Sequence, residues 1–512
     1  MSSILPIDSM KTHERNSPRT SDNEFKTEFD NKPKNKSRKI FCCGPGRKRH
    51  LIPLLCTTAL TIVIGMRSEM LGIISNIKSN SSFDSKNSID DNLIFKPSKH
   101  RNLPWTDNLL EDFIENAVFF ANMIGSPIGG YLTVNHDPSL LLGSSVAMTC
   151  GFNLFLPLVA TIGSNDTIKI TMVIIMRIFQ GLAEGCLIPA IFGVLRFWAP
   201  VNERSSIICF SVIGVSLGPL IGLPLCAAIE KKWGWGVVFY IYANLGLVWC
   251  IFWWRLVDER PSRSKSISAQ ERDYLLACID SKVAKANRNL PIPWKEIFRS
   301  KSIYAILFTY AADDWTFQIT SVCMQSYYEF KYHSDIENTI TLLVYPFLAR
   351  SIFVPAGGAV ADILGFTTTL SWTAIRKILT SIGFGLKGIF FIAMAFAKDE
   401  KTATVMLSLC LGFSGIAVAG YAVNVIEIAP NYAGLIMGMA SGLSTFTGIG
   451  STVIASVMVQ SMKQYGWMIA LCSAGAIQLF SLSMYLWFGS CKEEPWAFPP
   501  IDEENSNNSV NV

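Results

Sequence analysis

Charged side chains are scarce in this sequence. Lys and Arg number 44 and Asp and Glu 39 among 512 residues, which is 16%, whereas hydrophobic residues make up 50% and the mean hydropathy is +0.34. Soluble domains carry about 25% charged residues. The deficit argues against a soluble enzyme and indicates a polytopic membrane protein.

Signatures of catalysis and metal binding are also lacking. The five histidines lie outside any metal-like spacing, and there is no nucleophile elbow, phosphate-binding loop or zinc motif. We therefore expect no enzymatic activity, no cofactor, no bound metal and no ATP-driven pumping. Most of the 13 cysteines fall inside apolar runs, where they usually serve packing, so we expect no disulfide framework. The net charge of +5 accompanies basic flanks of apolar runs and predicts no nucleic-acid partner.

Long apolar runs dominate the rest of the chain. Each is about 20 residues or longer, enough for a helix to cross roughly 30 Å of hydrocarbon. We predict twelve spans, near 51–74, 110–133, 139–163, 168–194, 205–228, 236–256, 302–330, 338–361, 370–397, 402–426, 432–460 and 465–490. The second, interrupted by acids, and the ninth, which carries Arg376 and Lys377, are the weakest of these.

A polar interval separates the spans six and six. Lys and Arg cluster before the first span and in this interval, which by the positive-inside rule places both in the cytoplasm. The loop after the first span then lies on the opposite side, where Asn80 begins an Asn-Ser-Ser sequon and is the expected glycosylation site. The predicted organisation is a disordered cytoplasmic N-terminus without a cleavable signal peptide (1–50), a six-helix bundle (51–256), a cytoplasmic central loop (257–301), a second six-helix bundle (302–490) and a cytoplasmic tail (491–512).

Short echoes between the halves support a repeat. Pro-x-Gly-Gly closes the second span at 127–130 and the eighth at 355–358. Glycines recur every four residues on span five, through Gly218, and on span eleven, through Gly438, which lines them on one helix face. That face would either slide during transport or serve static packing. Parallel halves with a midplane site define the major facilitator architecture. The predicted fold is therefore an all-α polytopic membrane protein, with 12 transmembrane helices in two six-helix pseudo-repeats.

One polar stripe lies inside the fourth span. Arg177, Gln180 and Glu184 are spaced i, i+3 and i+7, so they share one face of a helix. Ionisable groups at membrane depth normally face a bundle interior or a watery cavity. The stripe indicates a transport pathway. The alternative is an internal Arg–Glu pair that only fixes helix packing.

Several motifs occur in the same order as in a known family. They are R-I-F-Q-G-L-A-E-G-C-L-I-P-A (177–190), W-A-P-V-N-E-R-S (198–205), D-W-T-F (314–317), R-K-I (376–378), N-V-I-E-I-A-P-N-Y-A-G-L-I-M-G (424–438) and E-P-W (494–496). Over about residues 50–500 the chain resembles solute-carrier family 17, the anion/cation symporter branch of the major facilitator superfamily, with sialin and the vesicular glutamate transporters. The resemblance implies a carrier of organic anions, of the sialic acid or glutamate type, or of phosphate. It further implies alternating access coupled to H⁺ or possibly Na⁺, in the plasma membrane or a lysosomal or vesicular membrane.

The resemblance also implies roles for single residues. Arg67 matches the family's span-one arginine and is expected to bind a substrate anion, because a guanidinium pairs bidentately with carboxylate or phosphate. Glu184 matches a span-four acid used in proton coupling. For Arg177, Gly218, Arg376 and Glu427 we expect gating or structural roles. The partners expected are a small anion and the bilayer, with a monomer as the default.

The chain departs from the family at acidic positions. Asp313 stands where glutamate carriers have a second arginine, and Glu115 adds an acid in the second span. We expect Asp313 and Gln318 to contact substrate, and Asp313 and Glu115 to join Glu184 in proton coupling. An unpaired Asp about 4 Å from a substrate carboxylate costs about 4 kcal/mol at an effective dielectric of 20, unless it is protonated or paired with Arg67. Open alternatives are a zwitterionic, cationic or monoanionic substrate, a stronger proton requirement, a channel-like anion conductance, or a non-transporting sensor.

Overall fold

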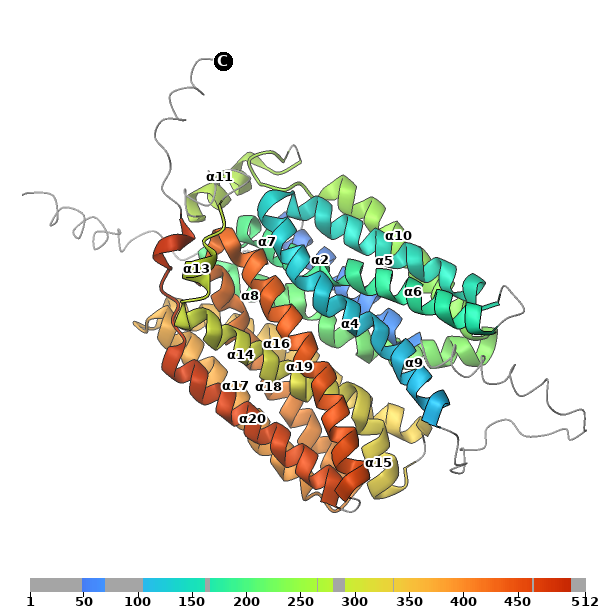
Figure 1. The fold of residues 1–512 in the computed structure, drawn as a ribbon. Coiled ribbons are helices and arrows are strands. Elements are labelled where there is room, and N and C mark those ends of the chain that lie inside the picture. The colour runs from blue at the N-terminus through green and yellow to red at the C-terminus, as the bar shows by residue number, and fades with distance from the viewer. Residues whose placement is uncertain are drawn as a thin grey trace, which may run out of the picture. The chain divides into compact units, whose positions relative to one another are not determined.

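The computed structural model describes residues 48–69, 105–161, 166–264, 266–279, 291–334, 336–462 and 465–498. The chain divides into two units, Met1–Gly46 and Arg47–Val512, and the first lies outside these residues, as does Asn80. The side chain of Glu115 is also outside the description, although its backbone is helical. Helices make up almost all of the described residues of the second unit, and the ranges described contain no strand (Figure 1).

Six spans form the first half. Their helices are α2 (Lys48–Gly65), α4 (Trp105–Asn135), α5 (Pro138–Thr161), α6 (Asp166–Gly185), α7 (Leu187–Trp198), α8 (Arg204–Val212), α9 (Gly214–Trp233) and α10 (Trp235–Leu256). Helices α6 and α7 make one span that is broken at Cys186, and α8 and α9 make one that is broken at Ile213. Two short helices of the central loop follow, α11 (Ala269–Cys278) and α13 (Trp294–Ile297).

The second half repeats this count. Its helices are α14 (Lys301–Gln318), α15 (Met324–Tyr332), α16 (Ile336–Thr367), α17 (Trp372–Ala395), α18 (Glu400–Ile428), α19 (Ala433–Met462) and α20 (Gly466–Phe488). A π-helical turn, Ile319–Cys323, joins α14 to α15 within one span. Single π turns inside helices often accompany functional sites.

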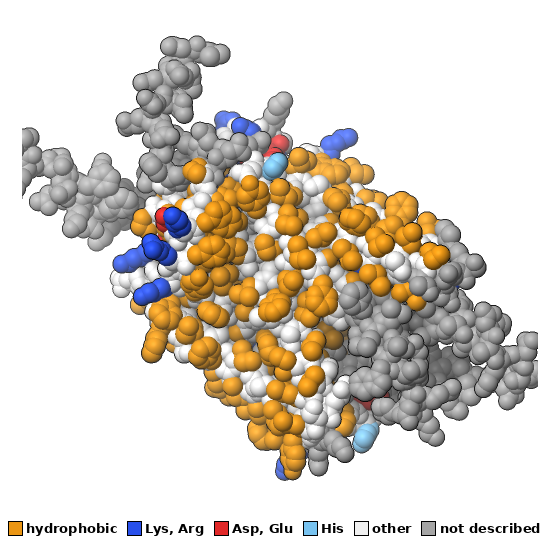
Figure 2. Space-filling view, in the orientation of Figure 1, with side chains coloured by type: hydrophobic (Ala, Val, Ile, Leu, Met, Phe, Trp, Pro, Cys, Tyr) orange, Lys and Arg blue, Asp and Glu red, His pale blue; other side chains and the backbone are white. Residues whose placement is uncertain are grey.

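The prediction of twelve spans is confirmed. Ten helical stretches in the described ranges are long and apolar enough to cross a membrane. The other two spans are α2, which opens on Lys48 and Arg49, and α14, which contains Asp313 and Asp314. Large hydrophobic side chains cover the face shown in Figure 2, and the Lys and Arg side chains visible there gather mainly along its upper and left border.

Local interactions explain where several helices begin. Helix α2 starts before the predicted position 51, because the backbone N–H groups of Lys48 and Arg49 donate to the Glu271 carboxylate at 3.3 and 3.0 Å. These are groups that a helix start leaves without internal partners. The ninth span begins sharply despite its basic residues, since the Ser371 hydroxyl caps α17 by accepting from the Ala374 N–H.

The two halves meet where α4 and α7 pack on α19 and where α8 and α9 pack on α16, and α8 also contacts α18. A Cβ placed on Gly438 of α19 would lie 2.5 Å from the Ser126 carbonyl oxygen of α4, so only glycine permits this approach. On Gly218 it would lie 2.8 Å from the Cβ of Ile64, which belongs to α2 of the same half. The glycine face of α19 therefore packs between the halves, whereas Gly218 packs within one.

Candidate functional site

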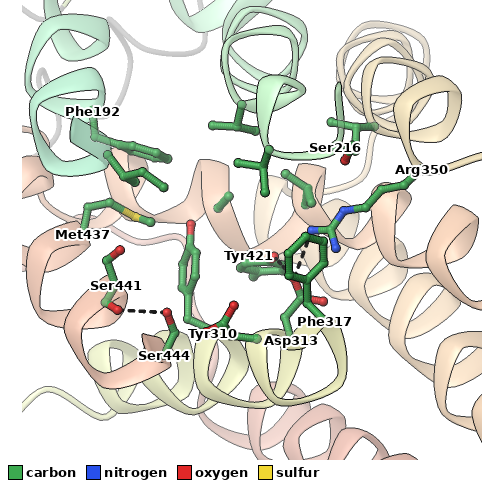
Figure 3. Close-up of a pocket in the computed structure, with 17 residues that line it drawn as sticks. Phe192, Ser216, Tyr310, Asp313, Phe317, Arg350, Tyr421, Met437, Ser441 and Ser444 are labelled. Atoms are coloured by element: carbon green, nitrogen blue, oxygen red, sulfur yellow. Dashed lines mark hydrogen bonds and ion pairs between the residues drawn. The ribbon is translucent and has the colours of Figure 1, made fainter. Parts of the chain in front are cut away.

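A cavity of about 120 Å³ lies between the two halves. The first half contributes mainly apolar side chains from α7, α8 and α9, including Phe192, and the second half contributes α14, α16, α18 and α19 (Figure 3). The charged residues that line it, Asp313, Asp314 and Arg350, all come from the second half. A mostly apolar cavity with a few converging polar groups is the usual form of a small-molecule site.

Asp313 is the most heavily bonded acid of this region. Its Oδ1 accepts from the Lys387 Nζ at 2.5 Å, and its Oδ2 accepts from the Arg350 Nη2 at 3.2 Å and the Tyr421 hydroxyl at 3.0 Å. Lys387 is on α17, Arg350 on α16 and Tyr421 on α18, and all four side chains are buried. Asp313 is therefore paired, as a buried acid must be, but with Arg350 and Lys387 rather than with Arg67.

Arg67 forms the second ion pair. It lies in the 3₁₀ turn Met66–Glu69 that follows α2, and its Nη2 is 2.6 Å from the Glu184 Oε1. Its Nε donates to the same oxygen at 2.9 Å, and the guanidinium lies over the Phe119 ring. Glu184 is buried, whereas the Arg67 side chain keeps 30% exposure. Arg67 is therefore more exposed than Arg350 and Lys387, the two cations that pair with Asp313.

The polar stripe of the fourth span is divided between two sets of contacts. The Arg177 Nη1 donates to the Gln180 Oε1 at 3.1 Å, whereas Glu184 pairs with Arg67 of another helix. Seven helical residues separate Arg177 from Glu184 by about 10 Å along the axis, too far for a direct pair. Glu184 thus pairs with the neighbouring span and not with Arg177 of its own helix, and it is not among the residues that line the cavity. Its place on a transport pathway stays a prediction.

Asp314 joins the two ion-pair clusters. Its carboxylate lines the cavity and lies against Gly448 of α19, where an added Cβ would be 2.6 Å from Oδ2. It interacts electrostatically with Arg67 of the first half and with Arg350 and Lys387 of the second. Within the described part of the chain, no hydrogen bond or ion pair holds this carboxylate. Gln318, one turn further along α14, is buried against Gly448 and is not among the cavity-lining residues.

These residues form one charge-balanced group, which we call the central charge cluster. Its members are Arg67, Glu184, Asp313, Asp314, Arg350 and Lys387. Three cations face three acids, so the group is neutral when all six are ionised.

Arg376 and Glu427 lie elsewhere, at the end of the bundle that carries the central loop. The Arg376 guanidinium binds both Glu427 carboxylate oxygens at 2.6 and 3.1 Å, and it donates to the Ser205 hydroxyl of α8 at 2.9 Å. Asp362 of α16 accepts from the backbone N–H groups of Ser205 and Ser206 at 3.1 and 2.8 Å. The contacts of Arg376 and Asp362 connect the two halves at this end. The gating or structural roles expected for Arg376 and Glu427 stay predictions.

Sequence reasoning missed Arg350, Lys387 and Tyr421 and gave Asp314 no role. Arg350 and Lys387 sit inside the apolar runs of spans eight and nine. The rule that draws attention to Glu184, that ionisable residues at membrane depth are functional, applies to them equally. Tyr421 carries no such signal, because tyrosine is common in apolar runs.

The comparisons with known proteins agree with this architecture. The model of the Major Facilitator Superfamily matches residues 113–452. Vesicular glutamate transporter 2.1 of Danio rerio is 30% identical over 465 residues, covering 90% of this chain and 77% of that protein. Vesicular glutamate transporter 2 of Homo sapiens is 29% identical over the same shares.

Solved structures share the fold at low sequence identity. The proton:xylose symporter XylE aligns with a TM-score of 0.59 at 13% identity, covering 86% of this chain and 98% of that one. The human organic anion transporter MFSD10 (TETRAN) aligns with a TM-score of 0.61 at 11% identity, covering 86% and 100%. These relatives are membrane transporters and not enzymes. The chain is therefore a multi-pass transporter of the major facilitator superfamily, in the solute-carrier family 17 branch that includes the vesicular glutamate transporters.

Proposed function

We propose that this protein is a proton-coupled carrier of small organic anions that works by alternating access. The observation that carries the proposal is the central charge cluster, whose Arg67–Glu184 pair belongs to the first half and whose other members belong to the second. Alternating access moves such halves against each other around a fixed site. The names of the related vesicular glutamate transporters and of the organic anion transporter support an anionic substrate.

Arg67 is the proposed substrate-binding cation. Its exposure exceeds that of Arg350 and Lys387, and its guanidinium presents the planar fork that carboxylates bind. A substrate carboxylate would replace Glu184 as its partner. Protonation of Glu184 would release Arg67 and keep the cluster neutral, because one proton enters with one anion.

Asp314 is the second proposed proton acceptor. It lies on the cavity wall next to Asp313, and within the described residues no hydrogen bond or ion pair holds its carboxylate. Asp313, in contrast, is held ionised by two cations, so it is a weaker candidate for proton acceptor than Glu184 and Asp314. The proposed role of Glu115 rests on its position in the sequence alone. Both termini are proposed to be cytoplasmic.

The test is uptake by the purified full-length protein in liposomes. Radiolabelled sialic acid, glutamate, aspartate, nucleotides and phosphate are supplied with an inward proton gradient, with a sodium gradient, or with neither. We expect saturable uptake that requires the proton gradient. Uptake driven by the sodium gradient would identify Na⁺ as the coupling ion in place of H⁺. An anion current that needs no substrate would support a channel and contradict the proposal.

Variants assign the roles. Arg67→Ala loses charge-assisted hydrogen bonds, each worth about 1.5–3 kcal/mol, so uptake should fall by about tenfold or more. The matched control is Arg299→Ala, which removes an exposed arginine of the central loop and should leave uptake unchanged. Glu184→Gln and Asp314→Asn should each weaken the dependence of uptake on the proton gradient. Full gradient dependence in both variants would exclude these two acids from coupling.

A further inference from the structure

We propose that Asp313 is a specificity-determining residue whose carboxylate fills a second anion site, formed by Arg350, Lys387 and Tyr421, and thereby restricts the carrier to substrates with a single carboxylate. This inference rests on the proposed function, with Arg67 as the cation that binds that carboxylate.

The donors around Asp313 have the composition of a carboxylate-binding site. A guanidinium, an ammonium and a phenol hydroxyl converge on two oxygens, with donor–acceptor distances of 3.2, 2.5 and 3.0 Å. They come from three helices of the second half, whereas the acid comes from a fourth, α14. Figure 3 shows Arg350 and Tyr421 directed at Asp313 on the wall of the cavity. The acid thus occupies the position that an external carboxylate would take.

Charge balance excludes a second substrate carboxylate. With both acids ionised, Asp313 and Asp314 neutralise Arg350 and Lys387, so the second half presents no excess of positive charge to the cavity. Protonation of Glu184 releases Arg67, which accepts one carboxylate. Protonation of Asp314 releases none of the three donors, because Asp313 still holds all of them. A dicarboxylate would place its second group against a neutral, partly apolar wall, where a charge without a partner is strongly disfavoured.

Removal of the internal carboxylate should open the second site. Asp313→Asn keeps the shape of the side chain but leaves Arg350 and Lys387 with one acid fewer, so an external carboxylate becomes a favourable partner. Asp313→Ala also leaves space, which a small carboxylate such as acetate or formate can refill.

The first measurement needs no transport. Thermal unfolding of the purified full-length wild type, Asp313→Ala and Asp313→Asn is recorded with and without acetate or formate, against chloride at equal ionic strength. We expect acetate and formate to raise the unfolding midpoint of Asp313→Ala more than that of the wild type. Equal shifts in both proteins would overturn the claim that the three donors form an anion site.

The second measurement is selectivity. Succinate and succinamate have the same skeleton but carry two carboxylates and one, and the pair glutarate and glutaramate repeats the comparison. The wild type should favour the monocarboxylate of each pair in equilibrium binding and in uptake, and Asp313→Asn should shift the ratio toward the dicarboxylate by about tenfold or more. Dicarboxylate preference in the wild type, or an unchanged ratio in the variant, would overturn the proposal.

Two control variants test whether the change in selectivity comes from the specific donor site or only from the net charge of the cluster. Asp314→Asn changes the charge of the cluster by the same amount as Asp313→Asn. Because Asp314 binds none of the three donors, the Asp314→Asn variant should not shift its selectivity toward dicarboxylates. The double variant Asp313→Asn with Lys387→Met restores the charge balance of the cluster and should lose the shift toward dicarboxylates. Equal gains in Asp313→Asn and Asp314→Asn would refute a specific site. If the wild type takes up no monocarboxylate at all, the proposed function fails, while the acetate result still decides whether the anion site exists.

Discussion

Gly438 allows a test of how the halves separate. In the structure α19 crosses α4 at this residue, and an added Cβ would lie 2.5 Å from the Ser126 carbonyl oxygen and 2.7 Å from the Gly130 Cα. Both are backbone atoms, so neither can move away without moving its helix. Gly438→Val should therefore weaken the crossing. Overpacking of this kind costs about 1–3 kcal/mol.

The expected consequence is a shift in population. The α4–α19 crossing joins opposite halves, so a loss of about 1.4–2.8 kcal/mol would increase the fraction of separated halves about 10- to 100-fold. The distance between fluorophores at Val201 of the first half and Leu370 of the second would report it. Both residues are exposed, and they lie on either side of the Ser205–Asp362 contact along the chain, since Val201 precedes Ser205 and Leu370 follows Asp362. Labelling through unnatural amino acids leaves the 13 cysteines in place.

The matched control is on the same helix. Gly450→Val introduces the same side chain where an added Cβ meets nothing within 4 Å. We expect a longer mean distance between the fluorophores for Gly438→Val and an unchanged one for Gly450→Val, with both proteins folded. A folded Gly438→Val protein with the wild-type distance distribution would refute the reasoning, as would equal opening in both variants.

Three further outcomes are expected. Glu427→Ala leaves the buried Arg376 without its carboxylate and should destabilise the protein by about 3–5 kcal/mol, measured by unfolding, whereas Glu427→Gln should lose less because it can still accept a hydrogen bond. Hydrogen bonds from Thr402 hold the pKa of Asp399 below its usual range, so the stability that this cap of α18 contributes is present at neutral pH and is lost as the pH falls through the lowered value. Asp399→Asn should keep the cap without that pH dependence, and an identical acid transition in both proteins would contradict this. Asn80→Gln should abolish a glycan-dependent gel shift, and an unchanged shift would mean that another sequon carries the glycan and that Asn80 is not the site.

The membrane spans could be predicted because span length and hydrophobicity are properties of short segments. Each apolar run meets the bilayer largely by itself, so the residues of one segment suffice to predict one helix. Helix ends depended on distant residues. The Glu271 carboxylate, from the central loop, accepts from the first N–H groups of α2, which therefore begins earlier than its apolar run.

The glycine faces show how one pattern can serve two purposes. Four-residue spacing through Gly218 and through Gly438 predicts close helix packing in both cases. Gly438 faces the opposite half, whereas Gly218 faces α2 of its own half. Which helix a glycine contacts depends on how the helices are arranged in the bundle, and the spacing of glycines within one helix does not predict that arrangement.

By itself, the sequence determined the class of protein, the twelve helices and the presence of costly charges inside them, because hydrophobic length and charge are read one segment at a time. Only the tertiary structure decided which charges meet. Arg67 pairs with Glu184 from a span 117 residues away, and Asp313 with Arg350 and Lys387, 37 and 74 residues away. Pairing depends on distances of a few ångströms between separate helices, and those distances exist only once the helices have packed.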